Sequence, residues 1–96
     1  MTRLIYSPAA DADARGIWDY TAEHWSEDQA DRYVDTIRDA CRDLAAGHKS
    51  GRPVAMRHGY LKYRVESHSI YYRLEDTILI VVRILHTKMD AERHLN

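Results

Sequence analysis

The chain has 96 residues, of which 45% are hydrophobic and 30% charged, and its 14 Lys and Arg against 15 Asp and Glu give a formal net charge of −1. This size predicts one domain over residues 1–96, and the near-neutral charge argues against a general nucleic-acid-binding protein, whose domain is usually basic throughout. No apolar run approaches the roughly 20 residues needed to cross a bilayer, and the N-terminus lacks the pattern of a signal peptide, so we expect a cytoplasmic protein with no membrane contact.

The beginning of the chain predicts a short strand and an amphipathic helix. Residues 4–6 read as the strand, and Ser7 is a typical helix N-cap, followed by Pro8 at the first helical position, where its missing N–H costs nothing. The helix should run from residue 9 to about residue 25 because apolar and small residues recur there at helical spacing. Its buried stripe would comprise Ala10, Ala14, Ile17, Trp18, Thr21 and Trp25, and most of the acidic residues Asp11, Asp13, Asp19 and Glu23 would lie on the other side.

A second helix follows with almost no linker. Ser26 and Gln29 form a capping-box pattern, and the helix should continue to about Ala46, with Gly47 as the stop signal. Two helices this close in sequence are expected to pack as an antiparallel hairpin. The apolar face of the second helix would comprise Ala30, Tyr33, Val34, Ile37, Cys41, Leu44 and Ala45.

The second half of the chain predicts a loop and three strands. Residues 48–59 contain two glycines and a proline and read as the loop. The strands are expected at residues 60–65, 69–74 and 77–85, which are rich in β-branched and aromatic side chains. The connections between them are short enough for hairpins, so the three strands should be antiparallel neighbours.

The order of these elements defines the expected fold class. The last strand is apolar on both faces at residues 78–82 and should therefore be central in its sheet, and residues 89–95 could add a helical turn. The chain is predicted to be an α+β protein of order β-α-α-β-β-β(-α), with a helical hairpin packed on a mainly antiparallel four-stranded sheet.

Several kinds of chemistry find no support in the sequence. The six histidines and the single cysteine show no paired ligand spacing, so we expect no metal site. Cys41 lies on the apolar face of the second helix, where a cysteine is usually a small core residue rather than an activated thiolate. The glycines are scattered and form no phosphate-binding loop, so no cofactor is expected.

The charges are unevenly distributed along the chain. Residues 1–50 carry six Lys and Arg against ten Asp and Glu, a balance of −4, and residues 51–96 carry eight against five, a balance of +3. Metal-free RNA cleavage would need a base, an acid and phosphate-binding cations, and these could come from the second half only if its basic residues converge on one sheet face. The plainer interpretation is a set of solvated strand and helix-end cations. The residues concerned are Arg57, Arg64, Arg73, Arg83, His86, Lys88 and His94.

The pattern as a whole resembles the ParE branch of the RelE/ParE toxin superfamily, over nearly the full chain. Its most specific part is the Arg-Ile-Leu-His sequence at residues 83–86, followed by Met89-Asp90 and Arg93-His94-Leu95. Further matching segments are residues 7–13 and 17–20, Gln29-Ala30, Gly59-Tyr60, and residues 63–65, 69–73 and 78–82.

This resemblance implies the toxin of a bacterial type II toxin–antitoxin pair. A ParD-like antitoxin would be its partner in a hetero-oligomer, DNA gyrase its target, and nucleic acid would be reached only indirectly, through the antitoxin. Such a toxin acts by protein binding and needs no cofactor. An exposed tryptophan is a natural interface anchor, and cations would pair with acidic partner residues. The partner-binding candidates are Trp25, Arg57, Arg64, Arg73, Arg83, His86 and His94.

Two alternatives stay open. RelE relatives cut messenger RNA on the ribosome, and Arg73, Arg83 and His86 would be the catalytic residues of such an enzyme here. RelE-type enzymes are typically strongly basic, however, and carry more lysine than Lys62 alone at the start of that site; this chain is near neutral and has no tyrosine beyond Tyr72. The third possibility is a degenerate toxin that only tunes the binding of its antitoxin to DNA.

Overall fold

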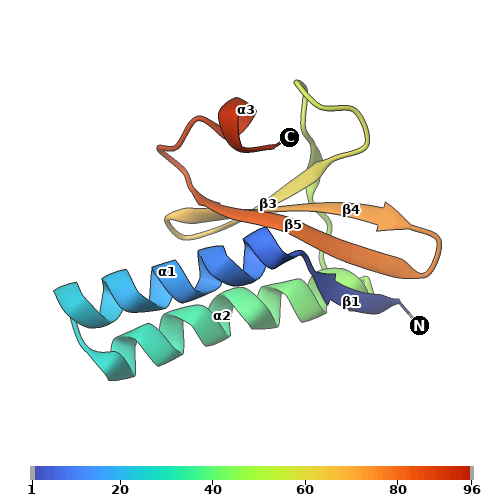
Figure 1. Cartoon of the computed structure of the whole chain (residues 1–96). Helices are drawn as coiled ribbons and strands as arrows, with labels where there is room; N and C mark the ends of the chain where they lie inside the picture. The colour runs from blue at the N-terminus through green and yellow to red at the C-terminus, as the bar shows by residue number, and fades with distance from the viewer. Residues whose placement is uncertain (1, 96) are drawn as a thin grey trace.

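The structure is a computed structural model that describes residues 2–95. Its elements are β1 (Arg3–Tyr6), α1 (Pro8–His24), α2 (Glu27–Ala46), β2 (Arg52–Pro53), β3 (Leu61–Val65), β4 (His68–Glu75), β5 (Ile78–His86) and α3 (Ala91–His94). Figure 1 shows α1 and α2 side by side on one face of the sheet, with α3 and the loop before β3 on the opposite face. The predicted α+β fold with a helical hairpin on a sheet is confirmed.

The helix ends follow the capping signals of the sequence. Ser7 Oγ accepts a hydrogen bond from the Ala10 N–H, and Ser26 Oγ accepts one from the Gln29 N–H, each at 3.0 Å. Gly47 ends α2 in the left-handed region, at φ 82°, which glycine adopts without a Cβ clash. No helix within residues 2–95 is both long and apolar enough to cross a membrane.

The sheet has five strands rather than the predicted four, in the order β1-β5-β4-β3-β2. β1 pairs with β5 in parallel, and the other neighbours are antiparallel. The additional strand, β2, lies in the predicted loop, and only Arg52 and Pro53 pair with β3. So short a strand containing a proline has no sequence signal, because its position depends on contacts with distant residues.

Gly51 allows β2 to approach β3 closely. A Cβ at this position would lie 2.6 Å from the Lys62 carbonyl oxygen and 2.7 Å from the Tyr72 hydroxyl. The Gly51 N–H also donates a hydrogen bond of 2.8 Å to that hydroxyl. Tyr72, itself buried, therefore reaches across from β4 and fixes the segment that leads into β2.

The main core fills the space between the helical hairpin and the sheet. Ile37 of α2, Ile70 of β4 and Leu79 of β5 are at most 2% exposed, and Cys41 is fully buried among them, as a core residue. Each large apolar side chain buried in this way stabilises the fold by roughly 1.5–3 kcal/mol. Trp18 was expected in the buried stripe of α1, but its ring is only half-buried, with its Nε1 donating to Asp31. Trp25, which was placed both at the end of that stripe and among the partner-binding candidates, is 69% exposed at the helix C-cap.

A smaller apolar cluster lies on the opposite face of the sheet, under α3. It consists of Val54, Tyr71, Leu85, Ala91 and Leu95, with Tyr60 packed against it. β4 and β5 each pair with a strand on both edges, so they are inner strands, as predicted for the apolar last strand, and side chains on both of their faces are buried.

A β-bulge in β5 changes which side chains face the helices. Tyr71 pairs with Arg83 but Tyr72 pairs with Val81, so Val82 is the additional residue. Val81 and Ile84, three positions apart, therefore both contribute to the main core. Without the bulge, strict alternation would direct Arg83 into that core.

Candidate functional site

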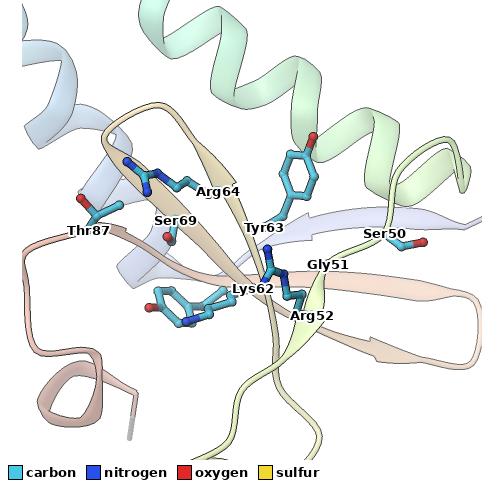
Figure 2. Close-up of a pocket in the computed structure, with 9 residues that line it drawn as sticks. Ser50, Gly51, Arg52, Lys62, Tyr63, Arg64, Ser69 and Thr87 are labelled. Carbon is cyan, nitrogen blue, oxygen red and sulfur yellow. The ribbon is translucent and has the colours of Figure 1, made fainter.

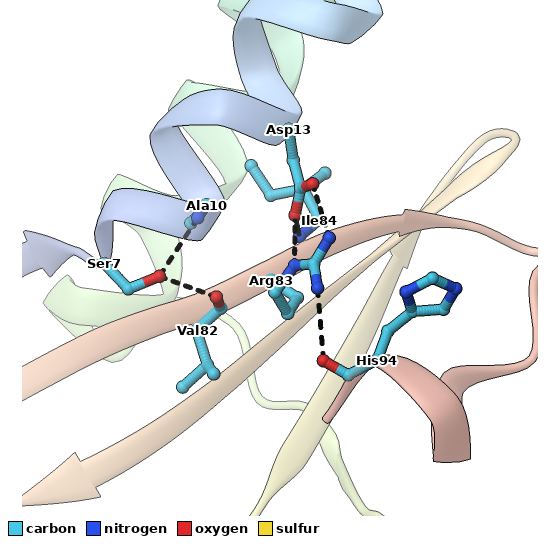
Figure 3. Close-up of polar contacts among 7 residues, drawn as sticks. All are labelled: Ser7, Ala10, Asp13, Val82, Arg83, Ile84 and His94. Atoms are coloured by element: carbon cyan, nitrogen blue, oxygen red, sulfur yellow. Dashed lines mark hydrogen bonds and ion pairs between the residues drawn. The ribbon is translucent and has the colours of Figure 1, made fainter. Parts of the chain in front are cut away.

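Asp13 of α1 covers the edge of β5 beyond the point where β1 ends, opposite the edge that pairs with β4. β1 pairs with β5 only as far as Val81, so the Ile84 N–H beyond it has no ladder partner on that side. Asp13 Oδ2 accepts this N–H at 2.9 Å, and Figure 3 shows the carboxylate between the helix and the strand. The carboxylate of Asp13 accepts two further hydrogen bonds from Arg83. Nε donates to Oδ2 at 2.7 Å, and Nη2 donates to Oδ1 at 2.8 Å.

Arg83 joins three elements and is largely enclosed. Its side chain is 22% exposed and that of Asp13 14% exposed. The hydrogen bonds with Asp13 raise the pKa of Arg83 and outweigh the opposing effect of burial. Nη1 donates to the His94 carbonyl oxygen at 3.2 Å, which ties α3 to β5. The geometry is that of a structural cation, and Asp13 is an exception to the expectation that the acidic residues of α1 lie mostly on the side away from the buried stripe.

His86 lies on the helix-covered side of the sheet, next to His68. The two residues face each other across β4 and β5, with their ring centroids 5.2 Å apart in an edge-to-face arrangement. The Tyr33 hydroxyl of α2 lies 2.6 Å from His68 Nδ1, and the Lys88 N–H donates to His86 Nδ1 at 3.0 Å. Burial lowers the pKa of His68, and His86 lowers it further, so the neutral ring is favoured.

A shallow apolar cavity of about 340 Å³ lies beside these histidines, between α1 and the end of β5. Tyr20 and Met89, which line it, are 62% and 43% exposed. The remaining lining residues are Ala12, Asp13, Gly16, Ile17, Thr21, His68, Ile84 and His86. An exposed apolar cavity of this kind is typical of a surface that receives a partner.

Arg57 and Arg73 gather around the ring of Tyr60. Their guanidinium carbons lie 5.8 and 5.7 Å from the ring centroid, and Arg73 Nη2 lies 3.0 Å from a carboxylate oxygen of Glu75. Arg73 is far from His86, because the strand register separates them by five residues of β4, or about 17 Å. The structure therefore does not bring Arg73, Arg83 and His86 into one catalytic cluster.

A cationic groove of about 570 Å³ lies across β2, β3 and β4 (Figure 2). Lys62 is opposite Tyr71 in the β3–β4 register, which places it on the sheet face away from the helices, whereas Figure 2 shows Tyr63 pointing toward α2. The Arg64 Nε donates to the Glu66 carbonyl oxygen at 2.8 Å. The described residues that line the groove include no Asp, Glu or His; they are Ser50, Gly51, Arg52, Lys62, Tyr63, Arg64, Ser69, Tyr71 and Thr87.

The seven partner-binding candidates thus fall into separate places. Arg83 and the His94 carbonyl are joined, Arg57 and Arg73 share Tyr60, and Arg64 lines the cationic groove. His86 borders the apolar cavity, and Trp25 stands exposed at the tip of the hairpin.

The sequence reasoning missed several residues of these sites. Asp13 lies three positions after Ala10 and four before Ile17, so helical spacing alone could have placed it beside the buried stripe. His68, Tyr33 and Arg52 carried no such signal, because their neighbours come from other elements. Within residues 2–95, no three His, Cys, Asp or Glu side chains are close enough to hold a metal ion.

Comparison with known proteins gives consistent matches along the chain. The family described as "ParE toxin of type II toxin-antitoxin system, parDE" matches residues 4–91. Toxin ParE1 of Mycobacterium tuberculosis is 41% identical over 97 residues, with 98% of each chain covered. Toxin ParE1 of Caulobacter vibrioides is 32% identical over 90 residues, with 93% of each chain covered.

Solved structures share the fold. A chain of the chromosomal ParDE TA system from P. aeruginosa superposes with a TM-score of 0.81 at 23% identity, covering 92% of this chain and 98% of that one. A chain of the toxin–antitoxin complex RelBE2 from Mycobacterium tuberculosis gives a TM-score of 0.67 at 18% identity, covering 88% of this chain and 96% of that one.

Proposed function

The chain belongs to the ParE toxin family of type II toxin–antitoxin systems, and from that premise we propose that it binds and poisons DNA gyrase and is neutralised by a ParD-like antitoxin. It would act in the cytoplasm, where both partners would meet it. The toxin inhibits by binding, without cleaving a substrate of its own.

We favour binding over catalysis because two groups that RNA cleavage would need lie on opposite faces of the sheet. These are the cationic groove, which could hold an RNA phosphate, and His86, which could transfer a proton. Lys62 lines the groove with Tyr71 on the face away from the helical hairpin, while His86 borders the cavity beside α1. Acid–base catalysis requires its groups within hydrogen-bond reach of the reacting atoms. Burial raises the pKa of Tyr71, which makes its hydroxyl a poorer proton donor at neutral pH.

The apolar cavity beside α1 is the surface that best suits the antitoxin. An amphipathic helix binds by placing its apolar face in a groove of this kind. Tyr20 and Met89 would flank that helix, and both are already exposed. The resemblance in fold to a chain of a ParDE complex supports an antitoxin partner.

The test is a gyrase assay with purified components and no ribosomes. We expect the toxin to block supercoiling or to accumulate gyrase-cleaved DNA, and equimolar cognate antitoxin to reverse the effect. A Tyr20→Ala, Met89→Ala variant should escape neutralisation while keeping its effect on gyrase. A toxin that arrests growth in cells but has no effect on gyrase at any concentration would refute the proposal.

RNA cleavage on the ribosome is the second candidate, and the cationic groove is the observation that favours it. In a translation extract, an enzyme of this kind would cut messenger RNA. Loss of cutting in His86→Ala would support the residues suggested by the sequence. Loss in Lys62→Ala, with His86→Ala unaffected, would place the chemistry in the groove instead.

A further inference from the structure

We propose that the cationic groove binds the phosphodiester backbone of a nucleic acid strand. The inference goes beyond the proposed protein-binding function and concerns a different surface from the apolar cavity. It departs from the expectation that nucleic acid is reached only through the antitoxin, because the toxin would contact the strand directly. Its test does not depend on which protein the toxin inhibits.

The groove concentrates positive charge in an arrangement set by the sheet. Lys62 and Arg64 are two positions apart on β3, so their side chains leave the same face about 6.6 Å apart. Arg52 of β2 is the register partner of Lys62 and adds a third cation. Because no described lining residue is acidic, nothing in the groove offsets this charge. Phosphates would therefore meet three cations along a short path.

The other lining residues are of the kind that contacts nucleic acid backbones. Ser50, Ser69 and Thr87 also line the groove, and Ser and Thr hydroxyls contact nucleic acid backbones in known complexes, as Arg and Lys do. Tyr71 is only 8% exposed, because its ring belongs to the apolar cluster under α3. A base cannot stack on a covered ring, so binding should be independent of sequence.

An acidic protein segment fits the groove less well. Protein interfaces depend on apolar or aromatic anchors that fill pockets. Within residues 2–95, the large exposed apolar side chains lie outside the lining of the groove; they are Ile5, Tyr20, Trp25, Met56, Leu74 and Met89. A ligand recognised by charge and hydroxyl groups alone is better matched by phosphates.

The groove is also held in shape before any ligand arrives. The Gly51 N–H bond to the Tyr72 hydroxyl fixes the segment that presents Arg52. A preformed site loses little conformational entropy on binding, which favours even a weak ligand. The acidic balance of −4 over residues 1–50, which include the helical hairpin, would repel a polyanion and direct it to this face.

The experiment measures fluorescence anisotropy of labelled single-stranded DNA and RNA of equal length against salt concentration. Three phosphate contacts predict a slope of log K against log salt of about −2 for a single strand. Lys62→Gln with Arg64→Gln should weaken binding about tenfold or more and reduce the slope to about −0.7. Both side chains are exposed, so the variant should remain folded, as its thermal unfolding would verify.

The matched control is Arg15→Gln with Arg32→Gln, which removes the same charge from exposed positions on the helices. It should keep nearly all of the affinity. Comparison of the two affinities shows whether the groove prefers DNA or RNA, and a preference for either supports the proposal. The proposal is overturned if the control variant loses as much as the groove variant, if no strand binds at low salt, or if poly-glutamate competes as well as an oligonucleotide of equal charge.

Discussion

The two faces of the sheet differ in how their polar groups are satisfied. On the helix-covered face, His68 is partly buried against Tyr33 with its neutral form favoured, and at the adjoining edge of β5 Asp13 of α1 neutralises Arg83. On the face away from the helical hairpin, Lys62 and Arg64 are exposed and border a groove with no acidic lining residue among those described. The first arrangement holds the fold together, and the second leaves charge available to a partner.

This difference shows that a basic segment is not one functional unit. Arg64 and Arg83 are both strand arginines in the half of the chain with a balance of +3. Arg83 is committed to Asp13 and to α3, whereas Arg64 is exposed beside the groove. Only the partner of each guanidinium separates a structural arginine from one that can bind a ligand.

The largest effect should come from the core of the helix-covered face. Ile70→Ala removes a fully buried side chain and leaves a cavity, so we expect a loss of about 3–4 kcal/mol in the free energy of unfolding, measured with urea. Leu74→Ala on the same strand, where the side chain is 57% exposed, should cost about 0.5 kcal/mol or less. Similar losses in both variants would show that the hairpin does not pack on β4 as described.

The ion pair at the end of β5 should have the next largest effect. Asp13→Asn leaves Arg83 partly buried without its counter-charge, which should cost roughly 2–3 kcal/mol. Asp39→Asn breaks the pair with Arg42, whose side chains are 61% and 68% exposed, and should cost less than about 0.5 kcal/mol. Equal unfolding midpoints for the two variants would contradict a structural role for Arg83.

Alanine substitutions at two glycines should change the free energy of unfolding in opposite directions. Gly51→Ala places a Cβ against the Lys62 carbonyl and the Tyr72 hydroxyl, so β2 must shift, at a cost of about 1–2 kcal/mol and with loss of binding in the groove. Gly16→Ala meets no atom within 4 Å inside α1 and should stabilise the protein by about 0.5–1 kcal/mol. Thermal unfolding of both variants checks the signs. A stabilised Gly51→Ala protein would mean that β2 is not held against β3.

The smallest expected effect is on pH dependence. The pKa of His68 is lowered in the folded state, so the unfolded chain binds more protons as the pH falls below about 6.5. The contribution of His68 is therefore present above that pH and is lost as the pH falls through the folded pKa. Urea unfolding at a series of pH values should show a flatter profile for His68→Gln than for wild type. His58→Gln, which replaces an exposed histidine, is the matched control. Equal slopes for wild type, His68→Gln and His58→Gln would exclude His68 as the cause.

The local features of this fold were readable from the sequence because they depend on near neighbours. Ser7 and Ser26 each cap the N–H of the residue three positions later, and Gly47 stops α2 by its own backbone conformation. Ala10, Ala14 and Ile17 are buried on one side of α1, as their spacing indicates. Three strands in the second half followed from their composition and short connections.

The features that were missed depend on residues distant in the chain. β2 forms because Gly51 packs against Lys62 and Tyr72, and the bulge at Val82 can be seen only in the pairing of β4 with β5. Asp13 could have been placed on the buried side of α1, but its three bonds to β5 could not. The same holds for the candidate site residues: the sequence shows which residues are cationic, but not which side chains lie next to them.

The sequence by itself determined the order of elements, the helix ends, most of the apolar core and the resemblance to a toxin family, because periodicity and capping act over a few residues. Only the tertiary structure decided that Arg83 pairs with Asp13, that His86 lies against His68, and that Arg52, Lys62 and Arg64 share a groove. The physical reason is that a charged side chain acquires its role from what lies within a few ångströms of it. In this protein those neighbours come from strands and helices far apart in the sequence.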